Sequence, residues 1–306
     1  MQRYLLSRLV QSFLLLLGVL IVVFFMIRLT GDPVSLMVPK EAPAEVREAF
    51  REANGFNRPL YAQFFEYLLN AFQLDLGHSL KFRQSNLSII MERLPSTVYL
   101  ATISLFLAIV IAVPIGIIGG FNPGSAADTV GRAFGLFGQT IPGFVFALYL
   151  ILIFAVRLGW LPSFGRDFWY SVILPATALS IGGIGQFVRL TRSAVLEIRN
   201  EDYIRTARSK GLSKMAIGAR HVARNAALAL ISVVTVQYSY MLGGSIYIES
   251  IFAWPGLGNL LQGAIVDRDF PLIQALAIVF SFFVVTLNLL TDVIYAVIDP
   301  RIRYGS

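Results

Sequence analysis

The feature that most constrains this chain is a set of six long stretches that contain no Asp, Glu, Lys or Arg. They cover residues 9–27, 94–127, 133–156, 168–188, 225–248 and 270–291. Each reaches or exceeds the roughly 17–25 residues that a helix needs to cross the hydrocarbon core of a bilayer. Backbone groups inside lipid must be hydrogen-bonded within the membrane-spanning structure itself, and an unpaired segment achieves this only as a helix. The sequence therefore predicts an all-α integral membrane protein with six transmembrane helices.

The composition agrees with this interpretation. Hydrophobic residues make up 56% of the chain and charged residues only 14%, whereas soluble domains have about 45–50% and about 25%. The chain has no cysteine, which excludes disulfides, thiolate metal sites and a cysteine nucleophile. Arg3 and Arg8 before the first stretch also fit a signal peptide, but the apolar run is too long and no small-residue cleavage site follows it, which favours a retained helix.

The distribution of Lys and Arg predicts the orientation of the helices. With the N-terminus inside, the cytoplasmic segments carry fourteen basic residues and the two short outer loops carry three. Segment 29–93 is left out of this comparison, because long loops are translocated largely regardless of their charge. We therefore expect both termini to be cytoplasmic.

These expectations divide the chain into four parts. Residues 1–28 form the first transmembrane helix, 29–97 a periplasmic helical insertion, 98–299 a five-helix core, and 300–306 a cytoplasmic tail. Within the insertion we expect helices over 41–53, from Pro59 to Phe72 and over 87–94, the last leading into Pro95 and the second span. The second of these carries apolar residues at helical spacing, namely Tyr61, Phe64, Phe65, Leu68, Leu69 and Phe72. This strip could lie on the membrane surface or pack against the ends of the spans, and we favour packing.

The inner loop 191–224 has eight basic residues against three acidic ones. Asn200 is a good N-cap, acidic residues follow it, and Gly211 is a natural residue to end a short helix. Ile204, Ala207 and Gly211 would share one face of that helix, and small residues there permit close approach of another surface. The loop is therefore interpreted as a docking helix. A pure topology signal is the simpler alternative, and nucleic-acid binding is disfavoured because no aromatic residues accompany the charge.

The segment EDYIRTARSKGLSKMAIGARHVARNA, residues 201–226, resembles the cytoplasmic motif of binding-protein-dependent ABC importer permeases. The match is best to the first permease subunit type of the dipeptide, oligopeptide, nickel and glutathione branch. Arg205, Thr206 and Ala207 stand in the first three places of the importer pattern Glu-Ala-Ala-x3-Gly, and Gly211 is its glycine. His221 and Arg224 replace the later Ile and Pro, as is typical of this branch. Segments 57–64 with 74–79, 242–258 and 299–304 are similar to the same branch in the same order.

The resemblance implies an alternating-access importer subunit of a bacterial or archaeal plasma (inner) membrane. Its partners would be a second permease, usually a paralogue, two ATP-binding subunits, and a periplasmic or lipid-anchored substrate-binding protein. The coupling residues that contact the ATPases would be Glu201, Asp202, Tyr203, Ile204, Arg205, Ala207, Arg208, Gly211 and Leu212. ATP and Mg²⁺ would bind to the partners, because this chain has no Gly-x4-Gly-Lys-Ser/Thr loop.

We predict no catalytic residue, metal site or cofactor in this chain. The two histidines, His78 and His221, lie far apart in the sequence, and no His-Glu-x-x-His motif occurs, so a protease is disfavoured. A secondary transporter or channel is the main alternative, but such proteins usually place ionisable residues within their spans. Asp292 is the one convincing candidate, and we interpret it as an interfacial carboxylate paired with loop arginines. Uncharged residues expected along the translocation path are Gln139, Gln186, Gln237, Met241 and Ser245.

Overall fold

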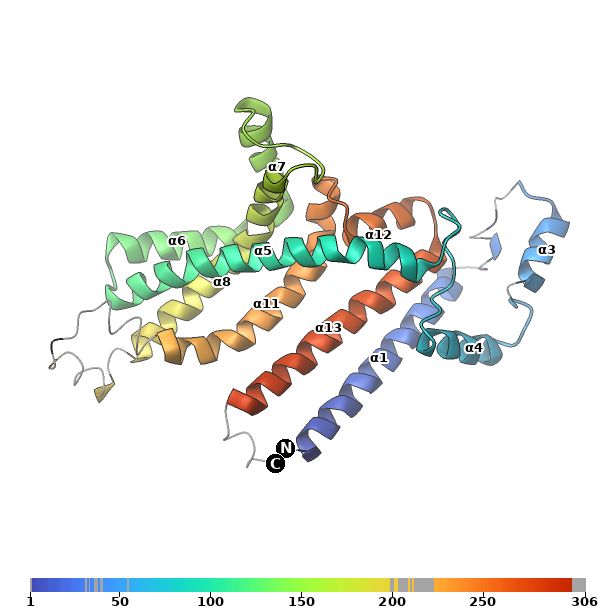
Figure 1. Ribbon diagram of the computed structural model, residues 1–306, viewed down its shortest axis with the longest axis horizontal. Helices are drawn as coiled ribbons and strands as arrows, with labels where there is room; N and C mark the ends of the chain where they lie inside the picture. Colours follow the sequence, from blue (N-terminus) through green and yellow to red (C-terminus); the bar gives the residue numbers. More distant parts are fainter. Residues whose placement is uncertain are drawn as a thin grey trace. The chain divides into compact units, whose positions relative to one another are not determined.

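The computed structural model describes residues 2–198 except 31, 33, 36–37, 39–40 and 54, together with 201–202, 209, 211 and 223–298. Its helices are α1 (Gln2–Thr30), α3 (Ala44–Ala53), α4 (Leu60–Phe72), α5 (Asn86–Phe121), α6 (Ala126–Thr140), α7 (Gly143–Leu150), α8 (Ile173–Ile198), α11 (Ala223–Ile251), α12 (Leu257–Val266) and α13 (Phe270–Ile298) (Figure 1). A π-helical turn, η1 (Ile151–Arg157), continues α7, and a 3-10 turn, η2 (Trp169–Val172), leads into α8. The described residues contain no β-strand, which agrees with the predicted all-α class.

Four helical segments among the described residues are long and apolar enough to cross a membrane. They are Leu6–Met26, Asn86–Phe121, Trp169–Ile198 and Phe270–Val293. Helix α11 has 29 residues, but the side chains of 223–232 lie outside the described set. These segments establish a helical protein with several membrane-length helices.

The stretch 133–156 differs from the expected single helix. Helix α6 ends at Thr140 and α7 begins at Gly143, with Pro142 between them in an extended conformation (φ −58°, ψ 134°). Proline has no N–H to donate and disfavours a helical residue before it. The stretch is therefore a broken helix.

Helix α5 also departs from the prediction. The helix expected over 87–94 leads into Pro95 and the second span as predicted, but the two form one helix, since α5 runs without interruption from Asn86 to Phe121. The missing hydrogen bond of one proline is tolerated in a long apolar helix. The predicted boundary between the insertion and the core, at residues 97 and 98, falls inside this helix.

The chain forms two compact units. One contains residues up to Pro95 together with 256–296, and the other contains Ser96 to Pro255. The core of the first includes Ile90, Leu257, Leu272 and Leu276. The core of the second includes Leu100, Ala147, Leu174, Phe252 and Trp254.

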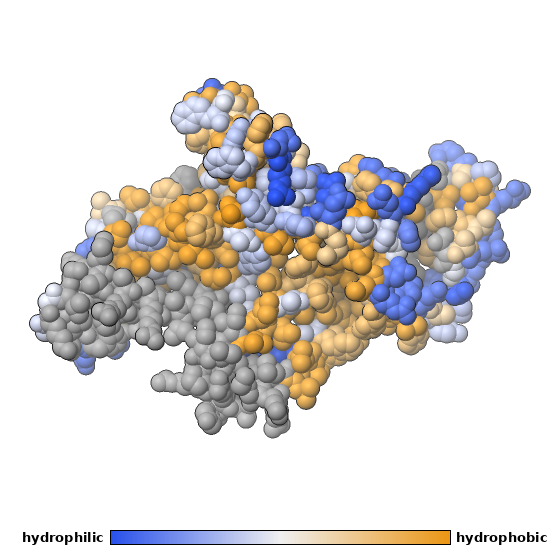
Figure 2. All heavy atoms as spheres, viewed as in Figure 1, coloured by the Kyte–Doolittle hydropathy of each residue, from blue (hydrophilic) through white to orange (hydrophobic). Residues whose placement is uncertain are grey.

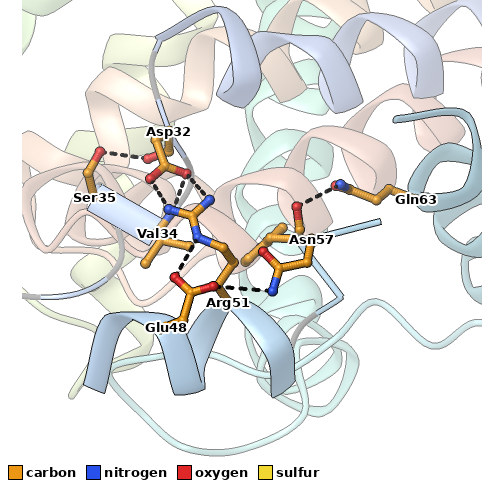
Figure 3. Close-up of polar contacts among 8 residues, drawn as sticks. Asp32, Val34, Ser35, Glu48, Arg51, Asn57 and Gln63 are labelled. Carbon is orange, nitrogen blue, oxygen red and sulfur yellow. Dashed lines mark hydrogen bonds and ion pairs between the residues drawn. The ribbon is translucent and has the colours of Figure 1, made fainter. Parts of the chain in front are cut away.

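In the first unit, an ion pair fixes α3 to the residues that follow α1. The Arg51 guanidinium donates to both carboxylate oxygens of Asp32, at 2.7 and 3.3 Å, and lies 3.5 Å from Glu48 (Figure 3). Asn57 donates to the same Glu48 at 3.4 Å. The start of the insertion is thus held by a small polar network.

A second polar cluster holds loop 76–85 against the turn between α12 and α13. The Ser79 hydroxyl donates to the carboxylate of Asp269, and both residues are buried. The Lys81 ammonium pairs with Asp267. Asp269 also accepts a hydrogen bond from the backbone N–H of Leu272 (3.3 Å), so this carboxylate caps α13 while it anchors the loop.

Candidate functional site

A groove of about 280 Å³ lies within the second unit, between α6, α7, α8 and α11. Aromatic and aliphatic side chains dominate its walls, among them Phe144, Tyr240, Tyr247 and Met241. Gln237 is the one lining residue with an amide side chain, and Tyr240 and Tyr247 carry hydroxyl groups. Ligand sites are typically apolar cavities with a few placed polar groups, and this groove has that character.

The structure brings together two of the five predicted path residues. Gln237 and Met241 both line the groove, one turn apart on α11. Ser245 is fully buried, and its hydroxyl donates to the Leu242 carbonyl at 2.8 Å. Gln186 is half-buried and does not line the groove, and the side chain of Gln139 lies outside the described set.

Glycines allow the helices around the groove to approach closely. A Cβ atom at Gly185 of α8 would lie 2.6 Å from the carbonyl oxygen of Gly135 in α6. A Cβ at Gly183 would lie 3.0 Å from Met241 Cε and 3.2 Å from Gln237 Nε2. Small residues at helix crossings are the usual means of packing helices in membranes, where the hydrophobic effect no longer drives association.

A buried ion pair connects the start of α6 to the end of α8. Arg192 Nε donates to Asp128 Oδ1 at 2.5 Å, and its NH2 group donates to Oδ2 at 3.1 Å. Asp128 is 1% exposed and also accepts a hydrogen bond from the Gly124 N–H at 2.9 Å. The Ser125 hydroxyl accepts one from the Asp128 N–H at 3.2 Å, as in an N-terminal helix cap. The sequence analysis counted Arg192 only among the basic residues that predict the orientation of the helices, and it did not predict the pair with Asp128.

These contacts predict how stability depends on pH. Hydrogen bonds from Arg192 and Gly124 lower the pKa of Asp128, which lies outside the predicted spans, from 3.8 to about 2. Since the folded-state pKa is below the unfolded value, the stabilisation is fully present above about pH 4 and is lost between pH 4 and pH 2. We expect the unfolding temperatures of wild type and Asp128→Asn to differ by a constant amount from pH 5 to 8 and to converge below pH 4.

The double variant provides the control for this prediction. Arg192→Gln alone leaves the buried Asp128 carboxylate with only the exposed Arg132, 3.7 Å away, as a cationic partner, so it should be less stable than Asp128→Asn/Arg192→Gln. Thermal unfolding of the detergent-purified chain measures both effects. If Arg192→Gln and the double variant are equally stable at pH 7, the Asp128 carboxylate costs nothing when Arg192 is absent, and the expected role of the pair is wrong.

The predicted coupling region is described at three positions. Glu201 and Asp202 are exposed. Gly211 has φ +78°, the left-handed conformation that favours glycine and commonly ends helices. Tyr203, Ile204, Arg205, Ala207, Arg208 and Leu212 lie outside the described residues. The coupling role of all nine residues therefore stays a prediction.

Two carboxylates near helix ends have defined partners. Asp292 pairs with an arginine at 3.3 Å, but this arginine is Arg8 within α1 and not one of the loop arginines that were expected. Glu249 is fully buried near the end of α11 and accepts a hydrogen bond from the Thr97 hydroxyl at 2.7 Å. The sequence analysis used Glu249 only as the charged residue that ends the stretch 225–248, and it did not predict that this side chain is buried.

The described residues contain no group of acidic, His or Cys side chains that could hold a metal.

The described residues form several membrane-length helices, and one of them, Trp169–Ile198, lines the largely apolar groove, an arrangement that suits a membrane permease. Solved structures support this fold. One titled "Inward facing conformations of the MetNI methionine ABC transporter: CY5 native crystal form" aligns with TM-score 0.58 and 19% identity over 69% of this chain and 96% of that chain. Another, "Crystal structure of an amino acid ABC transporter with histidines", aligns with TM-score 0.52 and 16% identity over 68% and 92%.

The sequence comparisons identify the family. The model described as "Binding-protein-dependent transport system inner membrane component" matches residues 112–304, and the corresponding N-terminal model matches residues 1–101. The glutathione transport system permease protein GsiC of Escherichia coli (strain K12) is 37% identical over 305 residues, 99% of this chain and 100% of that protein. GsiC of Shigella flexneri serotype 5b (strain 8401) has the same identity and coverage. This chain belongs to the binding-protein-dependent transport system permeases, which confirms the resemblance seen in its sequence.

Proposed function

We propose that this chain is the membrane-spanning subunit of an ATP-driven importer for peptides or a related small solute such as glutathione. The observation that carries the proposal is the 37% identity to glutathione permeases along 99% of the chain. The groove supports it, because Gln237 offers one hydrogen-bonding amide within an apolar wall. A solute with peptide groups can exchange hydrogen bonds with such an amide.

The proposed topology has six spans with both termini in the cytoplasm of a bacterial or archaeal cell. The fourteen-to-three distribution of basic residues supports this orientation. Breaks such as the one at Pro142 fit a permease, since irregular backbone within a membrane occurs where it is buried in protein or lines a cavity. Loop 191–224 would then lie on the side of the membrane where ATP is available.

The proposed assembly contains a second permease, two ATP-binding subunits and a substrate-binding protein. ATP and Mg²⁺ bind to the ATPase subunits, and the coupling residues transmit their closure to the helices. Such coupling needs a structural element with two states, and both the ATP site of the ATPase subunits and the solute path of the permease must influence the equilibrium between them. We propose that the helix before Gly211 connects the ATPase subunits to the helices of the permease.

Uptake by the reconstituted transporter tests this function. Vesicles that contain the complete transporter and its binding protein should accumulate labelled glutathione or dipeptide only when ATP is supplied on the ATPase side. Gln237→Leu should lower uptake about fivefold to tenfold, since a hydrogen bond contributes roughly 1 kcal/mol. Gln186→Leu is the matched control and should leave uptake near wild type, because Gln186 does not line the groove.

Two results would contradict the proposal. Uptake that follows an ion gradient without ATP would indicate a secondary transporter. Equal losses in Gln237→Leu and Gln186→Leu, with normal assembly, would show that the groove does not select the solute.

A further inference from the structure

Helix α4 has two chemically different faces. Gln63, Glu66 and Asn70 recur at helical spacing and line a cavity of about 450 Å³ whose walls are both polar and apolar. A second face carries Tyr61, Phe65, Leu69 and Phe72, called here the α4 strip. Each of these four side chains is more than 60% exposed. The prediction placed these four residues, together with Phe64 and Leu68, against the spans. Among the described residues the ring of Phe72 contacts Phe13 of α1 at its edge, and the four side chains otherwise stay exposed.

A third set of α4 residues does pack, and it packs against α1. The rings of Phe64 and Phe24 meet edge to face at 5.1 Å, and Tyr67 lies 5.5 Å from the same Phe24. At the C-terminal end of α4, the ring of the strip residue Phe72 stacks on Phe13 at 6.4 Å. Helix α4 therefore contacts α1 through its middle, at Phe64 and Tyr67, and through its last residue, Phe72.

These two attachments set the depth of α4. Phe24 lies near the end of the span Leu6–Met26, whereas Phe13 lies close to its middle. Eleven residues separate them, which corresponds to roughly 16 Å along a helix. The end of α4 thus reaches the level of the middle of a membrane span, where the surroundings of the protein are acyl chains.

The exposed surface of α1 continues the α4 strip. Leu9, Phe13 and Leu14 are each more than half exposed. Figure 2 shows hydrophobic side chains over the α1 and α13 region and hydrophilic ones gathered around α3. The lipid-facing side of α1 and the α4 strip therefore meet at the contact between Phe13 and Phe72.

We propose that α4 is embedded in one leaflet of the bilayer, with the α4 strip in contact with lipid acyl chains. Its thirteen residues are too few to span a membrane, so it enters and leaves on one side. Its polar face remains hydrated at the cavity, where Arg58 pairs with Glu66 at 2.9 Å. An apolar face opposite a polar one is the arrangement of helices that lie in the membrane interface.

Site-directed spin labelling tests the proposal. The chain contains no cysteine, so single substitutions can be labelled in the complete transporter, and the signal of the unsubstituted chain gives the background from its partners. Labels at Phe65→Cys and Leu69→Cys are measured in phosphatidylethanolamine and phosphatidylglycerol vesicles. Both should collide readily with oxygen and be protected from a water-soluble nickel chelate, as at Leu14→Cys on α1.

The polar face of the same helix gives the matched controls. Glu66→Cys and Asn70→Cys should show the reverse, with high nickel accessibility. Nickel accessibility at Phe65→Cys and Leu69→Cys as high as at these controls would show that the strip faces water. Protection of both from oxygen and nickel would show that another protein subunit covers it. Either result would overturn the proposal, and retained ATPase activity of each labelled transporter confirms that it is assembled.

Discussion

Ala207→Glu should abolish recovery of the ATPase subunits with this chain, and ATP-driven uptake with it. Ala207 belongs to the small-residue face of the predicted coupling helix, and a cleft that accepts alanine has no room for a longer, charged side chain. Overpacking a close contact costs about 1–3 kcal/mol, and an unpaired charge in the contact costs more. Subunit recovery after detergent extraction measures the effect, and substrate-stimulated ATP hydrolysis in vesicles measures its consequence.

Substitutions at neighbouring positions provide the controls. Gly211→Arg should also prevent assembly, but Gly211 has φ +78°, so this change adds backbone strain as well as bulk. Gly211→Asn tolerates the left-handed conformation better and separates the two effects. Arg208→Ala should be milder, since charges at the rim of an interface contribute more to steering than to affinity. If Ala207→Glu assembles and hydrolyses ATP like wild type, the loop is a topology signal and a secondary transporter becomes the leading alternative.

Gly185→Ala should sharply reduce the amount of folded chain. The added Cβ would lie 2.6 Å from the Gly135 carbonyl oxygen, a backbone atom that cannot move without displacing α6. Overpacking of this kind costs about 1–3 kcal/mol. The measurement is the fraction of chain that remains monodisperse in size-exclusion chromatography after heating.

Gly182→Ala, three residues earlier on α8, is the matched control. Its Cβ would have ordinary contact, with the nearest atom 3.8 Å away. Replacing glycine with alanine inside a helix otherwise stabilises it by about 1 kcal/mol. The two variants should therefore change stability in opposite directions. A gain in both would show that α6 and α8 are not closely packed at this crossing.

The fold class and the family were accessible from the sequence because both rest on local patterns. Charge-free stretches predict membrane-length helices. The prediction of one continuous helix was wrong for the stretch 133–156, which is broken at Pro142. Proline breaks one helix and is accommodated in another, as at Pro95 in α5. The difference depends on surrounding structure, which hydropathy does not record.

The site was only partly predictable, for a different reason. Gln237 and Met241 were identified as polar or flexible residues within a span, and they do meet at the groove. Ser245 has the same sequence character but hydrogen-bonds its own helix. The Asp128–Arg192 pair joins residues 64 positions apart, and no local pattern links them. Such contacts depend on how helices cross, which composition and spacing do not determine.

The division of the chain into two units has a mechanical consequence. Two of the points where the chain passes between units lie directly after a proline, at Pro95 within α5 and at Pro255 before α12. A proline cannot donate a backbone hydrogen bond, so a helix bends at such a position at less cost than elsewhere. If the units rotate during a transport cycle, α5 therefore acts as a jointed lever that can bend at Pro95, where the chain passes between units, while a second proline, Pro114, lies within the longer arm.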